Sequence, residues 1–292
     1  MKNLYITGGL GQDGKILTKI ISKKKFKIFI LTKKKIIKKS SGVIYIKTNL
    51  LKKEKISTIF NKNKPDIILH LAANNPAFKE KNYKKFYLEN IKSSFNLFNE
   101  SYKINNNLKF IFTSSVQIFE KKYGLVNENS KIKITTPYTK FRIEFDNFLK
   151  KKKIKYTNII LFNHDSKFRN KKFLIPRLMK ALKKRNLSFL KEIINNNIHG
   201  DFSHADDICA GIYKIILSKK KISRIILSSN YSTSVNDVIN FIIKKNRIKI
   251  NLNIFSKKSN FLKGNNFYAK KIINYKPKKN LFLAADEIYK SL

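Results

Sequence analysis

The stretch Asn3-Leu-Tyr-Ile-Thr-Gly-Gly-Leu-Gly-Gln-Asp-Gly14 places a short apolar segment before a glycine loop, and an amphipathic run from Ile16 to Ile21 follows. Glycine suits such a loop because the turn out of a strand often needs a positive φ, and a pyrophosphate approaches the backbone where a Cβ would clash. Free N–H groups at the start of the next helix then attract phosphates. The segment predicts a dinucleotide-binding turn, although the glycines alone would also form a turn without a ligand.

Apolar segments and amphipathic segments alternate along the first half of the chain. We expect strands at 27–32, 43–46, 66–73, 109–113 and 158–162, and helices at 88–102 and from Tyr138 onwards. The segment 66–73 is apolar along nearly its whole length, which is typical of a parallel strand buried on both faces. This alternation predicts an α/β fold built on a doubly wound parallel sheet of the Rossmann type.

Beyond residue 163 the alternation becomes less regular. The expected elements there are helices at 173–182, 207–216 and 235–243 and a strand at 224–228. We therefore expect a Rossmann domain that binds NAD(P) over residues 1–162, to which 199–229 returns. Residues 163–292 are expected to form mainly a smaller C-terminal lobe that binds the substrate near the strand ends.

The composition describes a globular but very basic protein. Lys and Arg number 64 against 18 Asp and Glu, which gives a formal charge of +46, and 42% of the residues are hydrophobic. Such a charge suggests a polyanionic partner. However, the lysines are spread along the whole chain and accompany abundant Asn, Ile, Phe and Tyr, which share A/T-only codons. We attribute the charge to base composition and expect no specific nucleic-acid partner.

Cysteine usage and hydropathy bear on the compartment. Cys209 is the only cysteine, which excludes an intrachain disulfide and a thiolate metal cluster and fits a reducing environment. The first expected strand starts at residue 3, and no apolar run approaches the roughly 18 residues of a membrane span. We expect a soluble cytoplasmic protein without a metal site, in which His70 is a hydrogen-bonded core histidine.

The expected cofactor contacts lie in the glycine loop and in the segments that follow the strands. No acidic residue ends the strand 27–32 to hold the ribose of NAD; Lys33-Lys34-Lys35 stands there instead and would favour the 2′-phosphate of NADP. We expect NADP, or NAD, to be bound by Gly8, Gly11, Gln12, Asp13, Gly14, Lys33, Asn49, Leu50, Leu71, Ala72 and Ala73.

Hydroxyl groups follow the strand 109–113 and open the next helix. Ser115 comes just after the strand, and Tyr138 starts a helix after Thr136-Pro137. The pattern resembles the hydride-transfer site of the short-chain dehydrogenase/reductase superfamily, in which the helix carries Tyr-x-x-x-Lys. A cation one helical turn after the tyrosine favours the phenolate and so enables proton exchange. Here that position is Arg142, which supplies charge but does not join a proton relay.

Over essentially its whole length the chain resembles GDP-mannose 4,6-dehydratases. Four segments carry the resemblance: Thr7-Gly-Gly-Leu-Gly-Gln-Asp-Gly14, Leu161-Phe-Asn-His-Asp-Ser166, Gly200-Asp-Phe-Ser-His-Ala-Asp-Asp207 and Asn274-Tyr-Lys-Pro-Lys278. The first two are fairly specific to that branch, and the last two occur widely among nucleotide-sugar epimerases and dehydratases. The resemblance implies a GDP-hexose substrate and an NADP that takes and returns a hydride.

The resemblance also implies roles for individual residues. Ser115 and Tyr138 match the catalytic hydroxyls, Arg142 the lysine, and Gln117 the glutamate that removes the proton at carbon 5 of the sugar. An amide cannot serve as that base. Asn163 matches a substrate-binding position. Two further residues could hold the nucleotide diphosphate or be ordinary surface cations: Arg169 and Arg177.

Several functions stay open at this level. The leading hypothesis is a divergent GDP-mannose 4,6-dehydratase-like enzyme. Gln117 favours a 4-epimerase or a 4-keto reductase, which needs no base at carbon 5, and Gln117 with Arg142 favours a binding protein whose activity has decayed. Relatives commonly pair through helices like 88–102, so a homodimer or homotetramer is expected from the resemblance. Asp206 and Asp207 are expected to cap and start the helix that follows them.

Overall fold

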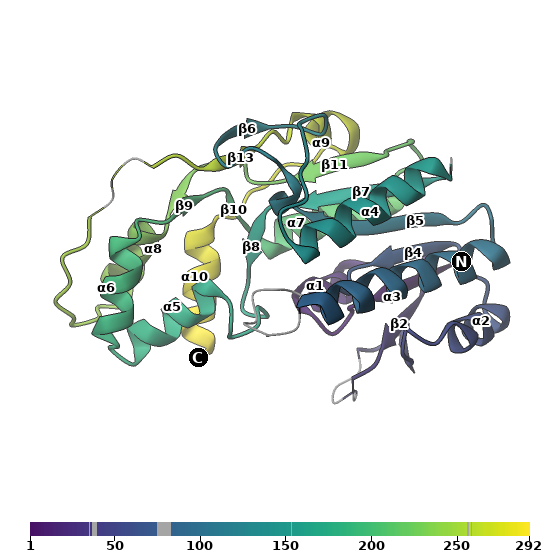
Figure 1. Cartoon of the computed structure of the whole chain (residues 1–292). Helices are drawn as coiled ribbons and strands as arrows, with labels where there is room; N and C mark the ends of the chain where they lie inside the picture. Colours follow the sequence, from purple (N-terminus) through teal and green to yellow (C-terminus); the bar gives the residue numbers. More distant parts are fainter. Residues whose placement is uncertain (35, 37–39, 75–82, 153, 256, 258) are drawn as a thin grey trace. The chain divides into compact units, whose positions relative to one another are not determined.

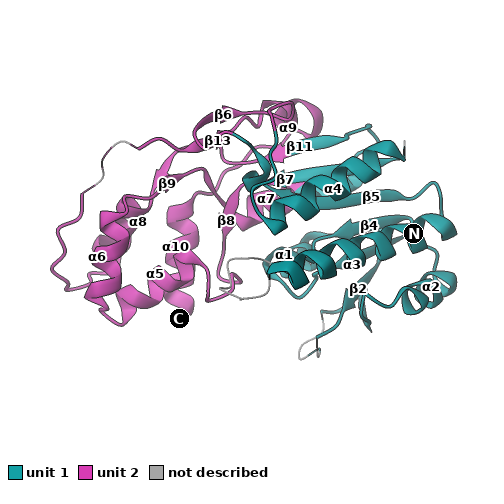
Figure 2. Ribbon diagram, viewed as in Figure 1, with its two compact units in different colours: residues 1–120, 132–160, 212–225 teal, residues 121–131, 161–211, 226–292 magenta. Residues whose placement is uncertain are grey.

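Figure 1 shows the computed structural model, which describes residues 1–34, 36, 40–74, 83–152, 154–255, 257 and 259–292. The chain divides into two compact units (Figure 2). Unit 1 comprises 1–120, 132–160 and 212–225, and unit 2 comprises 121–131, 161–211 and 226–292. Compared with the ranges expected from the sequence, unit 2 also holds the segments 121–131 and 199–211.

The central sheet has seven strands in the order β11-β7-β5-β4-β1-β2-β3. Their bounds are β1 (Lys2–Thr7), β2 (Phe26–Thr32), β3 (Val43–Lys47), β4 (Ile67–His70), β5 (Lys109–Ser115), β7 (Tyr156–Leu161) and β11 (Arg224–Leu227). The pairs β1–β2, β2–β3, β1–β4 and β4–β5 are parallel. The strand order reverses at the β1–β4 pair, as in a doubly wound Rossmann sheet. The predicted α/β class is confirmed.

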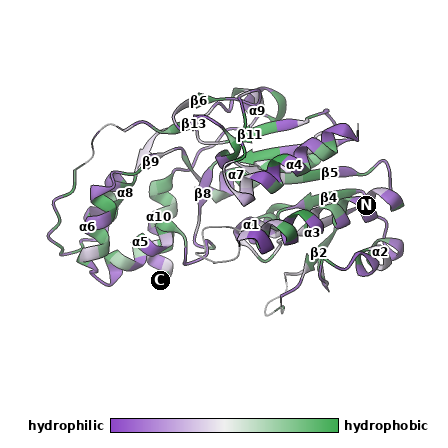
Figure 3. Cartoon of the chain, in the orientation of Figure 1, coloured by the Kyte–Doolittle hydropathy of each residue, from purple (hydrophilic) through white to green (hydrophobic). Residues whose placement is uncertain are grey.

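Both faces of the sheet are buried. Successive side chains of a strand point to opposite sides, so the burial of neighbouring residues in β1 and β2 reports on both faces. Tyr5 and Phe29 belong to an aromatic core on one face, where their rings stack with centroids 4.4 Å apart. The intervening Leu4 and Ile6 are fully buried as well. In Figure 3 the strands β4, β5 and β7 are largely green, the colour of hydrophobic residues.

Helices and a short 3-10 turn accompany the sheet in unit 1. They are α1 (Gln12–Ile20), α2 (Lys53–Lys62), α3 (Tyr83–Ile104), η1 (Val116–Ile118) and α4 (Pro137–Lys151). Side chains of α2, α3 and α4 complete the aromatic core with Phe60, Phe98 and Phe145. The helix α3 contains the predicted segment 88–102, but the expected apolar stripe is not uniformly buried, since Leu88 is 51% exposed.

Unit 2 has its own core. Its elements are β6 (Gly124–Val126), β8 (Asn163–Asp165), α5 (Leu174–Lys183), α6 (Leu187–Asn195), β9 (His199–Gly200), β10 (Phe202–His204), β12 (Thr233–Ser234), α8 (Val235–Lys245), β13 (Leu262–Gly264), α9 (Phe267–Ile273) and α10 (Leu281–Ser291), with part of α7 (Ala205–Leu217). The helices α5, α6, α8 and α10 bury one continuous apolar cluster that includes Met179 and Ile239.

A buried carboxylate joins distant segments within unit 2. Asp201 accepts hydrogen bonds from the Ser229 amide (2.8 Å) and hydroxyl (2.6 Å), the Asn230 amide (3.1 Å) and the Gly264 amide (3.1 Å). Burial raises the pKa of Asp201, and these donors act against that shift by stabilising the charged form. The residue therefore has a structural role that its sequence context does not indicate.

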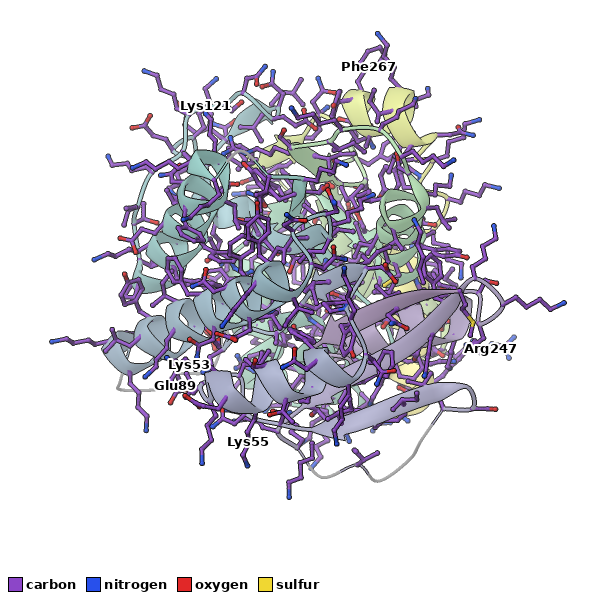
Figure 4. All side chains as sticks on the ribbon, turned by 90° about the vertical axis from the view of Figure 1, so that its right-hand side faces the viewer. Lys53, Lys55, Glu89, Lys121, Arg247 and Phe267 are labelled. Atoms are coloured by element: carbon purple, nitrogen blue, oxygen red, sulfur yellow. The ribbon has the colours of Figure 1, made fainter. Side chains whose placement is uncertain are left out.

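The positive charge lies on many elements. Figure 4 shows numerous side chains ending in nitrogen that point away from the ribbon, and Lys53 and Lys55 of α2 are among those labelled. The few carboxylates are shared among cations: Asp286 binds Lys245 at 2.9 Å and Lys290 at 2.8 Å. Such a distribution attracts anions in general.

Candidate functional site

The β1–α1 loop has the geometry expected of a phosphate-binding turn. Gly8 adopts φ +72°, and a Cβ on it would lie 2.9 Å from the Ala72 nitrogen. A Cβ on Gly14 would lie 2.3 Å from the Gly9 Cα, so the loop and the first turn of α1 touch backbone to backbone. Gly11 is the N-cap of α1 and has no side chain that could cap the helix itself, and helix starts of this kind are typical phosphate-binding positions.

The predicted cofactor contacts gather at one edge of the sheet. Parallel strands have their carboxyl ends at the same edge, where doubly wound sheets bind ligands. Gln12 and Asp13 open α1 behind the glycine loop. The other predicted contacts follow the strands directly: Lys33 after β2, Asn49 and Leu50 after β3, and Leu71, Ala72 and Ala73 after β4. Lys35, of the predicted basic run, lies outside the described residues.

One predicted boundary at this edge is wrong. The strand β4 ends at His70, whereas the sequence predicted a strand through Ala73. The Leu71 amide still bonds to the Thr7 carbonyl, at 3.3 Å. The backbone leaves the sheet after it, because the Ala72 amide bonds to the Thr7 hydroxyl, at 3.1 Å, and not to a backbone carbonyl of β1. The apolar character of Leu71 to Ala73 therefore belongs to a loop segment against which Gly8 packs.

Local sequence fixes the start of the helix that carries Tyr138. Thr136 is the N-cap of α4, Pro137 is its first residue, and Thr136 and Thr139 form a reciprocal capping box. Tyr138 is the second residue of the helix, which thus starts one residue earlier than the sequence predicted. Tyr138 is half-buried, and its ring lies edge-on to Phe141 with centroids 6.1 Å apart. The phenol is thus held at a defined place at the helix N-terminus.

Arg142 connects Tyr138 to the end of β5. It is only 4% exposed, and one of its terminal nitrogens donates to the Tyr138 hydroxyl at 3.3 Å. Its other terminal nitrogen donates to the Thr113 carbonyl. The guanidinium also lies over the Phe141 ring, 4.5 Å from the centroid. An arginine thus stands one helical turn after Tyr138, where the resemblance predicts a lysine, and places a permanent charge beside the phenol.

Lys140 does not replace Arg142. Its side chain is exposed and faces α3, where its Nζ lies 5.0 Å from the centre of the Tyr87 ring and 3.9 Å from Glu144. The Tyr87 hydroxyl donates to Glu144 at 2.5 Å, so these residues join α3 to α4. Burial, followed by the bond to Glu144 and its charge, raises the pKa of Tyr87 to about 12.

Ser115 and Gln117 lie at the carboxyl end of β5. Ser115 ends the strand and caps η1, where its hydroxyl accepts a bond from the Gln117 amide at 3.3 Å. The side chain of Gln117 is exposed. Just before them, the buried hydroxyl of Ser114 and the Nε of Arg142 have no hydrogen-bond partner among the described residues. Buried polar atoms without partners are often found at functional sites.

His70 is the hydrogen-bonded core histidine that the sequence predicted. It is 1% exposed, and its ring nitrogens contact Thr7 at 2.7 Å and Ser94 at 2.9 Å. Burial, and to a lesser extent the charge of Arg142, lowers the pKa of His70 to about 3. Sequence reasoning missed Thr7 and Ser94 as members of this network, because hydroxyl residues in a strand and a helix give no pattern of their own.

The predicted substrate-binding residues all lie in unit 2. Asn163 begins β8 with its side chain exposed. Arg169 bonds to Asp165 at 3.1 Å, and its guanidinium lies 3.7 Å from the centre of the Phe173 ring. The exposed Arg177 of α5 lies over the ring of Phe189, 4.8 Å from its centre. Its binding of the nucleotide diphosphate stays a prediction.

The acidic pair Asp206-Asp207 lies inside the first turn of α7, two residues further in than the sequence predicted. The helix begins at Ala205, so Asp206 and Asp207 stand in its first turn. Asp207 accepts from the Lys278 and Lys279 amides at 2.7 and 2.6 Å, and Asp206 binds the Lys279 ammonium at 2.6 Å. These carboxylates complement the helix dipole and also hold the segment before α10.

Sequence comparison places this geometry in a family. The profile of the NAD dependent epimerase/dehydratase family matches residues 4–226. The chain belongs to this family. That range contains the glycine loop, the strand ends of the sheet, and the Ser115, Tyr138 and Arg142 constellation. No curated protein sequence matches the chain.

Solved structures of two sugar-nucleotide 4-epimerases and a dehydratase are similar to this chain over nearly its whole length. A UDP-glucuronic acid 4-epimerase from Bacillus cereus, in complex with NAD, has a TM-score of 0.82 at 17% identity and covers 99% of this chain and 98% of its own. A UDP-Glc/GlcNAc 4-epimerase from Campylobacter jejuni gives 0.81 at 17% identity, with coverage of 100% and 99%. A dTDP-glucose 4,6-dehydratase from Bacillus anthracis, in complex with NAD, gives 0.80 at 17% identity, with coverage of 100% and 96%.

Two kinds of feature are absent from the part of the chain that the structure describes. None of the helices in this part has the length and apolarity that crossing a bilayer requires. No three His, Cys, Asp or Glu side chains among the described residues are grouped closely enough to hold a metal ion. Cys209, the single cysteine, is buried and free of any disulfide.

Proposed function

We propose that the protein is an NAD(P)-dependent nucleotide-sugar enzyme that oxidises and reduces carbon 4 of the sugar, as a 4-epimerase or 4-keto reductase does. The observation that carries the proposal is the contact between Tyr138 and Arg142 at the end of β5. It gives the chain a phenol beside a fixed positive charge, next to the strand that ends in Ser115. Family membership supports this class of reaction.

The β1–α1 loop fits the dinucleotide that such a reaction needs. Gly8 and Gly14 let the loop pack directly against the backbone of Ala72 and Gly9, where any Cβ would clash, and the N-cap Gly11 has no side chain to compete with a phosphate. When bound, the nicotinamide supplies the hydride acceptor and donor. We propose that NADP binds at least as well as NAD, because Lys33 follows β2 and is exposed where an acidic residue would serve NAD. The B. cereus and B. anthracis structures contain NAD.

The residues of unit 1 supply the acid–base part of the reaction. Tyr138 would accept the proton of the sugar 4-hydroxyl as the carbon is oxidised and return it on reduction. Arg142 would stabilise the phenolate and stay protonated throughout, since a guanidinium does not lose its proton in proteins. Ser115 would donate a hydrogen bond to the sugar oxygen. The constellation thus supports reversible proton exchange at one hydroxyl.

Gln117 distinguishes this reaction from dehydration. Removal of the carbon 5 proton requires a base, and the exposed amide of Gln117 offers none. A GDP-mannose 4,6-dehydratase-like activity is the second candidate, and the segments 7–14 and 161–166 favour it. We propose a GDP-linked sugar as substrate in either case. Asn163 would contact the sugar, and Arg169 and Arg177 would bind the diphosphate. A homodimer or homotetramer in the cytoplasm completes this proposal.

A panel of nucleotide sugars would test the proposed function. Purified protein is incubated with UDP- and GDP-hexoses and their 4-keto derivatives, each with NADP, NADPH, NAD or NADH, and products are identified by mass spectrometry. Epimerase or reductase activity gives an inverted or reduced carbon 4. A 4-keto-6-deoxy sugar would instead establish dehydration.

Two controls separate the alternatives. Transfer of deuterium from carbon 4 of the sugar reports hydride movement even when no net product forms. A protein that binds dinucleotide, as seen by a shift in melting temperature, but moves no hydride with any sugar would be a binding protein. Binding of DNA that disappears between about 50 and 200 mM salt would mark non-specific charge rather than function.

A further inference from the structure

A single-file chain of hydrogen bonds runs through the core of unit 1, and its direction is fixed. The Ser94 hydroxyl donates to the Asn90 carbonyl at 2.8 Å, so it accepts the bond from His70 Nε2 at 2.9 Å. Nε2 therefore carries the proton, and Nδ1 accepts from the Thr7 hydroxyl at 2.7 Å. The Thr7 oxygen in turn accepts from the Ala72 amide at 3.1 Å.

Burial keeps this chain in one state. Thr7 and Ser94 have no exposed surface, and His70 is 1% exposed. The lowered pKa of His70 keeps its ring neutral at physiological pH. A protonated ring would donate from both nitrogens, and Thr7 would then have no acceptor for its own proton. The hydrogen-bond chain therefore stays intact only with a neutral imidazole in the Nε2–H tautomer.

The chain ends on the backbone that forms the candidate dinucleotide turn. Thr7 precedes Gly8, whose Cα packs so closely on the Ala72 backbone that a Cβ would lie 2.9 Å away. Within the turn, the Gly11 amide bonds to the Gly8 carbonyl at 2.9 Å. On the other side, the Asn90 side chain bonds both backbone groups of Asn74, at 2.8 and 3.1 Å. The helix α3 thus holds the segment 72–74 at a fixed spacing from β1.

We infer that His70 is a positioning residue for dinucleotide binding. With Thr7 and Ser94 it fixes the spacing between Gly8 and Ala72, so that the amide groups of the turn are preorganised for a pyrophosphate. Preorganised sites bind more tightly because less order is lost on binding. The inference rests on the proposed function for the identity of the ligand, but it makes a claim about the free protein as well: the turn is ordered before any ligand binds.

The test compares two serines of α3 in the full chain. Ser94 and Ser101 are both fully buried, and both hydroxyls donate to a backbone carbonyl of the same helix, but only Ser94 contacts His70. Ser94→Ala and Ser101→Ala are measured without ligand by amide hydrogen exchange in peptides covering 8–14 and 71–74. Isothermal titration calorimetry then gives the dissociation constants of NAD and NADP.

Ser94→Ala is expected to speed exchange in both peptides and to weaken dinucleotide binding by about tenfold, the value of one hydrogen bond. Ser101→Ala is expected to change neither relative to the wild type. Equal behaviour of the two variants would overturn the inference, and so would faster exchange with an unchanged dissociation constant. If the wild type binds neither dinucleotide, the proposed function fails. The amide exchange rates of the two serine variants then decide alone whether the hydrogen-bond chain orders the turn.

Thr7 gives an independent pair of variants if Ser94→Ala does not fold. Thr7→Val keeps the shape but removes the hydroxyl, whereas Thr7→Ser keeps the hydroxyl. We expect Thr7→Ser to retain the slow exchange and the affinity of the wild type, and Thr7→Val to lose both. A merely structural hydroxyl would affect stability without this difference in the turn. Loss of both properties in Thr7→Ser would contradict the role assigned to the hydrogen-bond chain.

Discussion

The exits of β1 and β4 and the exit of β5 lie on the same edge of one sheet, but their polar groups are satisfied to different degrees. At β1 and β4, Thr7, His70 and Ser94 form a continuous hydrogen-bond chain, and the glycines fit closely against backbone. At β5, Ser114 Oγ and Arg142 Nε are buried without partners among the described residues. The β1–β4 end is therefore ordered by contacts within the protein itself, whereas the β5 end keeps buried polar atoms whose hydrogen bonds are unmet within the described part of the chain, as functional sites often do.

The sharpest test of the β5 end is removal of its phenol. Tyr138→Phe is expected to lower turnover by about 10²- to 10⁴-fold, the usual contribution of general acid–base catalysis, while leaving dinucleotide affinity unchanged. The measurement is the rate of hydride transfer from carbon 4 of a deuterated sugar. Tyr87→Phe is the matched control, since its hydroxyl joins α3 to α4 through Glu144. Turnover that survives in Tyr138→Phe would contradict the assignment of the phenol.

The β1 end is tested by adding one methyl group. Gly8→Ala is expected to weaken dinucleotide binding by at least about tenfold, because the turn must shift away from Ala72. Gly124→Ala is the control: Gly124 has a similar φ of +84°, but no atom lies within 4 Å of its Cβ position. Both variants are expected to lose about 1–2 kcal/mol of stability from the left-handed backbone. Equal affinities in calorimetry would show that the close approach at Gly8 does not matter.

Arg142 joins Tyr138 of α4 to the Thr113 carbonyl of β5, and its removal is expected to lower the free energy of unfolding. Arg142→Met leaves the Tyr138 hydroxyl and the Thr113 carbonyl without their donor, and we expect a loss of about 1–3 kcal/mol. The measurement is the free energy of unfolding in urea. Arg142→Lys restores the residue found in the family pattern and is the matched control. A lysine variant with higher turnover than the wild type would show that Arg142 limits catalysis.

The pH dependence of stability tests the neutral state of His70. Its pKa of about 3 lies below the ordinary 6.5, so between these values the unfolded chain binds more protons than the folded one. The contribution of His70 is therefore complete above pH 6.5 and is lost as the pH falls toward 3, with a slope of up to about 1.4 kcal/mol per pH unit. We expect this slope to vanish in His70→Asn. A ring that protonates near pH 6 by NMR would contradict it.

The smallest expected effect on stability is at Gln117. Gln117→Glu changes an exposed side chain, so stability should change by less than about 0.5 kcal/mol. The new carboxylate could serve as a base at carbon 5 of the sugar. Appearance of a 4-keto-6-deoxy product in this variant alone would show that the β5 end lacks only that group for dehydration. The same product from the wild type would refute our preference for chemistry confined to carbon 4.

The sequence predicted the parts of the fold whose pattern is local. The glycine loop, the apolar strands and the helix start after Thr136-Pro137 each follow from neighbouring residues, and the structure contains all of them. It missed α2, where only Ile56 and Phe60 are buried and the helical pattern is correspondingly weak. It placed the end of β4 too late, because a hydroxyl group from Thr7 rather than a change in hydropathy ends the strand.

Site geometry was less accessible, because it depends on directions that a sequence does not contain. The spacing of Tyr138 and Arg142 predicted that they share a helix face, and the structure shows their contact. No spacing could indicate that Arg142 also reaches the Thr113 carbonyl, or that His70 joins Thr7 to Ser94. Those contacts cross between elements far apart in the sequence, where only the three-dimensional arrangement brings the groups together.

Asp201 couples the local unfolding of three segments of unit 2. Its carboxylate accepts hydrogen bonds from Ser229, Asn230 and Gly264, which lie 28, 29 and 63 residues after Asp201 in the sequence. Detachment of any one segment removes a hydrogen bond from this buried carboxylate, so the opening of one segment weakens the hold on the others. A protease that cuts near Gly264 would thereby loosen the strand pair around Gly200 as well.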